Sequence, residues 1–220
     1  MPSHASERFA KNKKDIEMLW HIHAEVAGSG KRRQQRVDVL NRAAMVFISA
    51  CWESYVEDVA TEAFNYLLLN AASPDAFPPK VRTVASRELR ESKDERRIWE
   101  LAGDGWRRVI EAHGDAVREK WLKDFNTPKS RQVTELFQGL LDMPDITANW
   151  TVHSMSADQA AAKLDEYMTI RGNIAHRIKH DETVYKNWGK DFLSHVVLLV
   201  NKSDIAIGSH LHTLTGAPPW

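Results

Sequence analysis

The chain has 220 residues, 43% of them hydrophobic, and its 30 Lys and Arg residues are balanced by 30 Asp and Glu residues. A globular chain of this length favours one domain with a core that needs neither metal nor crosslink. The zero net charge excludes a generically basic nucleic-acid binder and an acidic disordered chain. The single cysteine excludes an internal disulfide framework and a zinc site built from cysteines.

The N-terminal residues carry no apolar stretch long enough for a signal peptide. The longest nearly uncharged apolar run, residues 192–200, is much shorter than the roughly 20 residues of a membrane-spanning helix. We therefore expect a cytoplasmic protein that has no membrane partner.

The neutral total hides bands of charge along the chain. Residues 46–79 and 132–170 each have a net charge of −5, whereas residues 1–45 and 80–131 each have +4. Solvated helix faces joined by salt bridges would produce such bands, and so would a surface that faces a polyanion. The sequence leaves both interpretations open.

Apolar residues spaced three and four apart predict helices in the first half of the chain. Residues 37–69 form the longest such pattern, which we expect to stop near Asn70 because prolines follow. Residues 80–100 predict a thin, exposed, charge-rich helix. Glycines then predict a break, followed by a short helix that ends before Gly114.

The second half of the chain is also predicted to be helical. One apolar face lies between Pro128 and Met143, and Ser156 stands three residues before Gln159, which is the spacing of a capping box. Residues 190–213 are apolar on most faces and predict a central helix. No alternating strand pattern is present, so the fold class is all-α.

The segment from Arg171 to Arg177 reads RGNIAHR and carries the most informative side chains. Residues five apart on an ideal helix point about 140° apart, so Arg171 and His176 would not converge on an undisturbed helix. Either Gly172 breaks the helix, or a second copy of the chain supplies the other wall of a shared site. Taken alone, the segment is equally compatible with a helix-end arginine and a histidine bonded to a backbone carbonyl.

This segment resembles the R-x4-H motif of the HEPN superfamily, helical domains found in prokaryotic defence and toxin systems and in RNA-processing proteins. Upstream, residues 46–59 read VFISACWESYVEDV and resemble the first core helix of the RiboL-PSP-HEPN group and of a second HEPN group. The order and separation of the two segments fit these groups. The resemblance implies an all-α, HEPN-type helical bundle with an added helical insertion.

The implied organisation has three parts. They are an N-terminal helical and basic segment at residues 1–36, the HEPN-like domain at 37–213 with its insertion at about 72–150, and a tail at 214–220.

The resemblance further implies a metal-independent endoribonuclease that needs no cofactor and acts as a homodimer on RNA, as a toxin or an anti-phage effector. An antitoxin or another defence-system protein would be its partner. His176 would transfer protons, because the pKa of histidine lies near 6.5. Arg171 would hold the scissile phosphate, and Asn173 would orient the ribose or the histidine.

Other residues have two readings each. Glu53 either supports the site through Arg171 or belongs to a solvated acidic edge, and Tyr55 is expected in the core. The basic residues beside the motif would bind the RNA backbone. The basic cluster at residues 31–36 either binds the RNA backbone as well or forms a solvated loop. The four RNA-binding candidates are Arg177, Lys179, Arg32 and Arg33.

The motif also departs from the family pattern. Gly172 occupies a position that often holds Asn or Asp, and Arg177 replaces a common glycine. Ile178 stands where toxins silenced by a nucleotidyltransferase have tyrosine, which argues against that mode of control. Gly172 favours the alternative function, a catalytically inactive HEPN domain that acts as an RNA- or protein-binding dimerisation module. An unrelated helical interaction protein is a third possibility.

Histidine pairs raise the question of a metal site. His176 and His180 have the spacing of an HExxH helix, but Arg177 occupies the position where a metalloprotease needs Glu. The other pairs have no evident third ligand, so we expect no metal.

Overall fold

A computed structural model describes residues 1–26, 31–124, 128–177 and 184–220, without the side chains of residues 23–26, 31–36, 122–124, 176 and 177. This described part of the chain is helical, and it contains no strand beyond an isolated bridge between Val152 and Met155. The all-α prediction is confirmed.

The eight α-helices and three short 3-10 segments follow one another along the chain without an intervening strand in the described residues. They are α1 (His4–Val26), α2 (Lys31–Asn70), η1 (Pro74–Ala76), α3 (Pro79–Ala85), α4 (Arg87–Glu91), η2 (Glu95–Leu101), α5 (Gly105–Asp124), α6 (Ser130–Leu141), η3 (Ile146–Asn149), α7 (Ala157–Arg177) and α8 (Lys186–Thr215).

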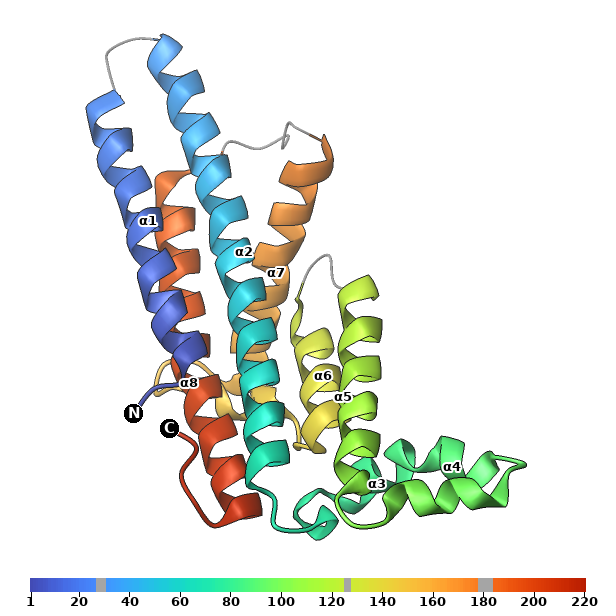
Figure 1. The fold of residues 1–220 in the computed structure, drawn as a ribbon. Helices are drawn as coiled ribbons and strands as arrows, with labels where there is room; N and C mark the ends of the chain where they lie inside the picture. The colour runs from blue at the N-terminus through green and yellow to red at the C-terminus, as the bar shows by residue number, and fades with distance from the viewer. Residues whose placement is uncertain (27–30, 125–127, 178–183) are drawn as a thin grey trace.

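Helices α1, α2, α7 and α8 run side by side as a bundle, with α5 and α6 alongside (Figure 1). The long helix α2 packs against all five of the others because its apolar residues, at helical spacing, are buried along its length. Trp52 and Tyr55 are fully buried and their polar atoms are satisfied. Trp52 Nε1 donates to the Pro128 carbonyl at 3.0 Å, and the Tyr55 hydroxyl donates to the Val200 carbonyl at 3.1 Å. The prediction that Tyr55 belongs to the core is confirmed.

Two helix boundaries match the sequence prediction. Helix α2 ends at Asn70, just before the prolines. At the start of α7, Ser156 Oγ accepts a hydrogen bond from the Gln159 amide at 3.2 Å, and Gln159 Oε1 accepts one from the Ser156 amide at 2.9 Å. This is the predicted capping box.

Other boundaries differ. Helix α2 begins at Lys31, six residues before the prediction, and α8 extends beyond the predicted residues 190–213 at both ends. The boundary proposed between residues 36 and 37 therefore lies within a helix. The division of the chain into an N-terminal segment, a domain and a tail stays a prediction.

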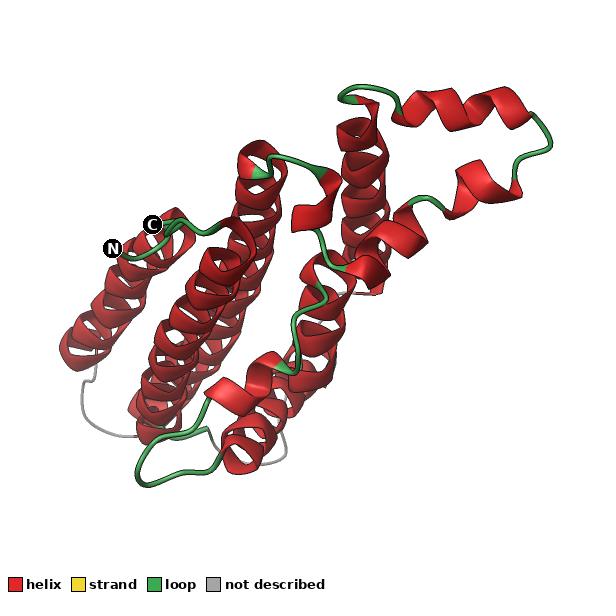
Figure 2. Ribbon diagram, turned by 90° about the horizontal axis from the view of Figure 1, so that it is seen from below, coloured by secondary structure: helices red, strands yellow, loops and turns green. Residues whose placement is uncertain are grey.

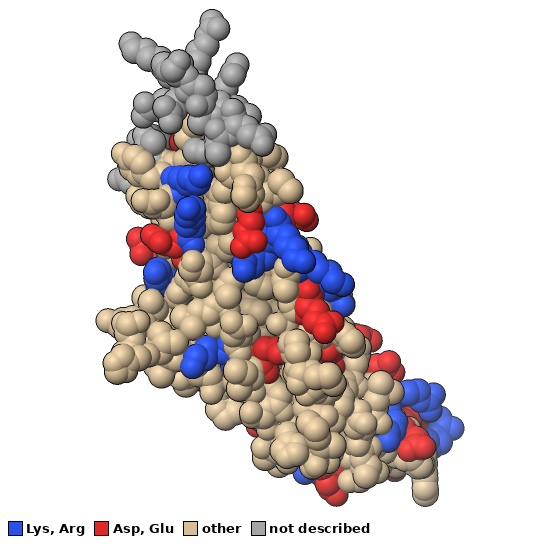
Figure 3. Space-filling model, turned by 90° about the vertical axis from the view of Figure 1, so that its left-hand side faces the viewer, with Lys and Arg blue, Asp and Glu red and all other residues tan. Residues whose placement is uncertain are grey.

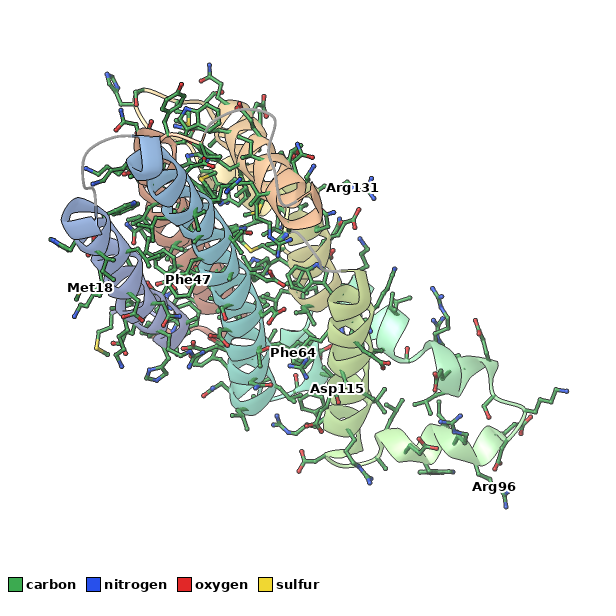
Figure 4. All side chains as sticks on the ribbon, turned by 90° about the horizontal axis from the view of Figure 1, so that it is seen from above. Met18, Phe47, Phe64, Arg96, Asp115 and Arg131 are labelled. Atoms are coloured by element: carbon green, nitrogen blue, oxygen red, sulfur yellow. The ribbon has the colours of Figure 1, made fainter. Side chains whose placement is uncertain are left out.

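The predicted end of a helix before Gly114 is wrong, because α5 continues through this residue. A Cβ atom at Gly114 would lie 2.3 Å from the ring of Phe64. Figure 4 shows Phe64 between α2 and α5. The glycine thus allows α5 to approach α2 closely, and it does not serve as a helix breaker.

The single exposed helix predicted for residues 80–100 is also wrong. The segment forms α3, α4 and η2, and the last two, residues 87–101, make a projection that we call the arm (Figure 2). Arg96 lies at the outer part of the arm (Figure 4). At the base, Arg107 donates hydrogen bonds to the Leu68 and Ala71 carbonyls and so caps the end of α2.

The chain ends both pack onto the bundle. The Ser3 amide and hydroxyl donate to the carboxylate of Asp204 on α8. The Tyr66 hydroxyl donates to the Ala217 carbonyl at 3.2 Å, and the Trp220 indole lies over Gly208. None of the helices in the described residues has the length and apolarity needed to cross a bilayer.

Candidate active site

Helix α7 carries the RGNIAHR segment, and its register against α2 and α8 is set by buried contacts. The Ser49 hydroxyl on α2 donates to Met168 Sδ at 3.3 Å. On the α8 side, Tyr167 stacks on Phe192 with ring centroids 4.4 Å apart. These contacts lie about one helical turn before Arg171, so they determine where the arginine points.

Arg171 lies at the interface with α2 and is half-buried, with its Nε hidden from solvent. Glu53, which follows Ser49 by one turn of α2, interacts electrostatically with Arg171. Burial raises the pKa of the Glu53 carboxyl, and the positive charge of Arg171 opposes this effect. The structure therefore places Glu53 within electrostatic range of Arg171.

Glu57 extends this acidic edge by one more turn of α2. Burial raises the pKa of Glu57, and the neighbouring charges of Glu53 and Asp58 raise it further. Asp58 is neutralised on its other side by Arg8, whose Nε lies 2.9 Å from the carboxylate. Glu53 thus belongs to a local cluster of acidic side chains in which burial raises the pKa of both Glu53 and Glu57.

Helix α7 continues through Gly172 to Arg177, so the first of the two alternatives, a break at this glycine, does not occur. Positions 171 and 176 are separated by a rise of about 7.5 Å and a rotation of about 140° on this helix. No described atom lies within 4 Å of a Cβ built on Gly172, so a side chain would fit there. Within one chain, positions 171 and 176 face different directions. Completion of a shared site by a second copy stays a prediction.

The remaining candidates that belong to described helices lie at one end of the bundle. Asn173 is exposed, and His176 and Arg177 lie in the last turn of α7, with side chains outside the described part. Lys179 also lies outside the described residues, as do the side chains of Arg32 and Arg33, which open α2. Figure 1 shows the start of α2 and the end of α7 at the same end of the bundle.

Lys129 is a cation near the motif that the sequence did not indicate. Its Nζ donates to Thr169 Oγ1 at 3.0 Å, and positions 169, 173 and 176 share one face of α7. The junction is held by Asp165, which accepts hydrogen bonds from the Ser130 amide at 2.8 Å and hydroxyl at 2.9 Å. No sequence pattern links Lys129 to a helix 40 residues away, because the contact depends on how α6 starts beside α7.

The described residues were searched for groups that could bind a metal ion or act through a thiol. No group of three or more His, Cys, Asp or Glu side chains is arranged there to hold a metal ion. Cys51 is buried, and burial together with the charge of Asp15 raises the pKa of its thiol to about 11. The thiol is therefore protonated near neutral pH and is a poor nucleophile.

The chain was compared with protein families, curated proteins and solved structures. The family model RiboL-PSP-HEPN matches residues 7–209, which is most of the chain and includes both α2 and α7. No curated protein matches, and no solved structure matches.

Proposed function

Because the chain belongs to the RiboL-PSP-HEPN family of the HEPN superfamily, we propose that it is a metal-independent endoribonuclease that acts as a homodimer in a toxin or anti-phage system. Domains of this superfamily commonly dimerise and bind RNA. The observation that carries the proposal is the position of Arg171, half-buried on α7 and within electrostatic range of Glu53 on α2.

The reaction is an attack by the ribose 2′-oxygen on the adjacent phosphorus. His176 accepts the 2′-hydroxyl proton, the new O–P bond forms, and the bond to the 5′-oxygen breaks. A protonated histidine returns a proton to the leaving 5′-oxygen. The products are a 2′,3′-cyclic phosphate and a 5′-hydroxyl end, and DNA is not a substrate because it lacks the nucleophile.

Arg171 supplies a permanent positive charge and a planar set of donors for the phosphate oxygens as negative charge develops on them. Glu53 acts as a positioning residue, since a carboxylate beside the guanidinium restricts its orientation. Asn173 orients the ribose or the histidine. Each role uses a group on α2 or α7, whose packing is set by the buried contacts around Met168.

Two chains are needed because positions 171 and 176 point about 140° apart on one helix. In a shared cleft, the arginine of one chain works with the histidine of the other. Arg177, Arg32 and Arg33 belong to the end of the bundle where α2 begins and α7 ends, and together with Lys179 they then bind the RNA backbone.

The test is incubation of the purified protein with RNA in EDTA. We expect cleavage by the wild type and a loss of at least about 100-fold in His176→Ala and in Arg171→Ala, in line with the usual contribution of an acid–base group. Mixed dimers of the two variants restore one complete site and should regain up to half of the wild-type activity. Full activity of His176→Ala would overturn the mechanism.

Gly172 favours a second candidate function, the catalytically inactive HEPN module that binds RNA or a protein. RNA binding without cleavage by the wild type would select it. The Gly172→Asn variant restores the residue type common in the family and has room for its side chain. Cleavage that appears only in this variant would show that the wild type is a silenced enzyme.

A further inference from the structure

A groove separate from the Arg171 and Glu53 site lies between α1 and α8. It has a volume of about 730 Å³, and its lining combines apolar side chains with three lysines and one glutamate. Its lining residues are Lys13, Glu17, Trp20 and His21 of α1, and Lys186, Lys190, Leu193, Ser194 and Val197 of α8.

We propose that this groove binds a single-stranded segment of the RNA substrate, outside the cleavage site. The inference rests on the proposed function, which supplies RNA as the ligand, and it adds the place and the strandedness of a second contact.

The lysines of α8 are the first argument. Lys186 and Lys190 are one helical turn apart, and neither forms an ion pair with a carboxylate among the residues that the structure describes. Lys186 is the first residue of α8, where the helix dipole also disfavours positive charge. Across the groove, Lys13 is paired with Glu17 at 3.3 Å. A polyanion in the groove would give Lys186 and Lys190 the negatively charged partner that they lack among the described residues.

Trp20 is the second argument, because it provides an aromatic surface among the cations. Its ring packs against Gly189, where an added Cβ would lie 3.6 Å from the indole, and the side chain stays partly exposed. Leu193 and Val197 are the other large apolar side chains of the lining. A base stacked on Trp20, with its neighbouring phosphates at the lysines, matches the way proteins bind single strands. A duplex would keep its bases paired and would leave Trp20 unused.

The position of the groove fits a continuous path for one strand. Its upper part is formed by the start of α8, at the same end of the bundle as the end of α7 (Figure 1). Figure 3 shows the side of the molecule that carries α1, where Lys and Arg side chains lie on the upper half among Asp and Glu side chains. An RNA cleaved near His176 can therefore extend into the groove.

The experiment measures binding of a fluorescently labelled single-stranded RNA to the His176→Ala protein by anisotropy, across a range of salt concentrations. The groove variant carries Lys13→Gln, Lys186→Gln and Lys190→Gln. We expect it to bind at least 10-fold more weakly at about 0.1 M salt, with a salt slope lower by about 2, since each lost phosphate contact removes about 0.7. Trp20→Leu should lose about 5- to 150-fold in affinity with an unchanged salt slope.

The matched control carries the same charge change outside the groove, with Lys93→Gln, Lys120→Gln and Lys202→Gln, and should bind within about twofold of the parent. Circular dichroism and thermal melts confirm that each variant folds. Parent-like affinity in the groove variant overturns the inference, as does equal loss in the control. Weakened binding of duplex RNA or of anionic vesicles, with single-strand binding unchanged, also overturns it.

The two proposals fail in different ways. If the chain is not a nuclease, the wild type leaves RNA intact while binding still depends on the groove lysines. If the groove inference is wrong, the wild type cleaves RNA and the groove variant does so with the same KM. If both hold, the groove variant shows a raised KM with kcat retained at saturating RNA.

Discussion

The bundle and the arm are built from similar helical, charge-rich sequence but are held together differently. In the bundle, large side chains such as Trp52 and Trp150 are fully buried. In the arm, Trp99 is 75% exposed and Ile98 is 53% exposed, and the local contacts include the ion pairs of Arg96 with Asp94 and Arg97 with Glu100. Exposed pairs contribute little stability. A helix without an apolar face to bury thus becomes a projection of short turns.

The largest effect should come from removing a tryptophan of the bundle. Trp52→Ala leaves a cavity beside Trp150 and Tyr55 and removes the hydrogen bond to Pro128. We expect the free energy of unfolding to fall by about 3–5 kcal/mol, measured by urea denaturation.

The matched variant is Trp99→Ala in the arm, which removes the same side chain from an exposed position. Its free energy of unfolding should change by no more than about 0.5 kcal/mol. Comparable losses in the two variants would contradict the distinction between the bundle and the arm.

An intermediate effect is expected where α5, which follows the arm, meets the bundle. Gly114→Ala places a methyl group against the ring of Phe64 and should destabilise the fold by about 1–3 kcal/mol. Gly172→Ala is the control, since it also replaces a glycine inside a helix but meets no described atom within 4 Å. That variant should gain about 0.5–1 kcal/mol. Thermal melts of the two variants measure these changes in stability. A stabilised Gly114→Ala would show that α5 can move away from α2.

The smallest expected effect is the pH dependence of the free energy of unfolding. One carboxyl of the bundle and one of the arm should change this stability in opposite directions as the pH rises. Burial raises the pKa of Asp204 in the bundle, despite its hydrogen bonds from Ser3. Its contribution to stability is therefore present below the ordinary value of 3.8 and is lost as the pH rises through the folded-state value. In the arm, hydrogen bonds from Arg96 lower the pKa of the exposed Asp94, so its contribution is lost as the pH falls.

Urea denaturation between pH 3 and pH 7 tests this difference. Asp204→Asn should gain stability relative to the wild type as the pH rises. Asp94→Asn should show the opposite and weaker trend. A rise in the relative stability of both variants with pH would contradict the assignment of Asp94.

Local signals in the sequence were sufficient for several features of the fold. The prolines after Asn70 and the capping box at Ser156 act through neighbouring residues, and both boundaries were predicted correctly. The effects of Gly114 and Gly172 depend on what packs against them. The ring that packs against Gly114 belongs to Phe64, 50 residues away, and no local pattern reveals such a neighbour.

Part of the candidate site could also be predicted from the sequence, and part could not. The resemblance of residues 46–59 and 171–177 to one family placed Glu53 and Arg171 together as an expectation, and the structure brings their charges into range. Lys129 beside Thr169 was missed, and so was the groove that joins Lys13 to Lys186. These pairs meet only because whole helices pack side by side, and single residues at such separations leave no periodic signal.

The docked chain ends have a practical consequence for the experiments above. Residues 1 and 220 lie close together (Figures 1 and 2), well away from the end of the bundle where α7 finishes. Met1 is 98% exposed, so a purification tag or fluorophore attached before it leaves Ser3 in place against Asp204. Such a label reports on RNA binding without occupying the surface on which binding is measured.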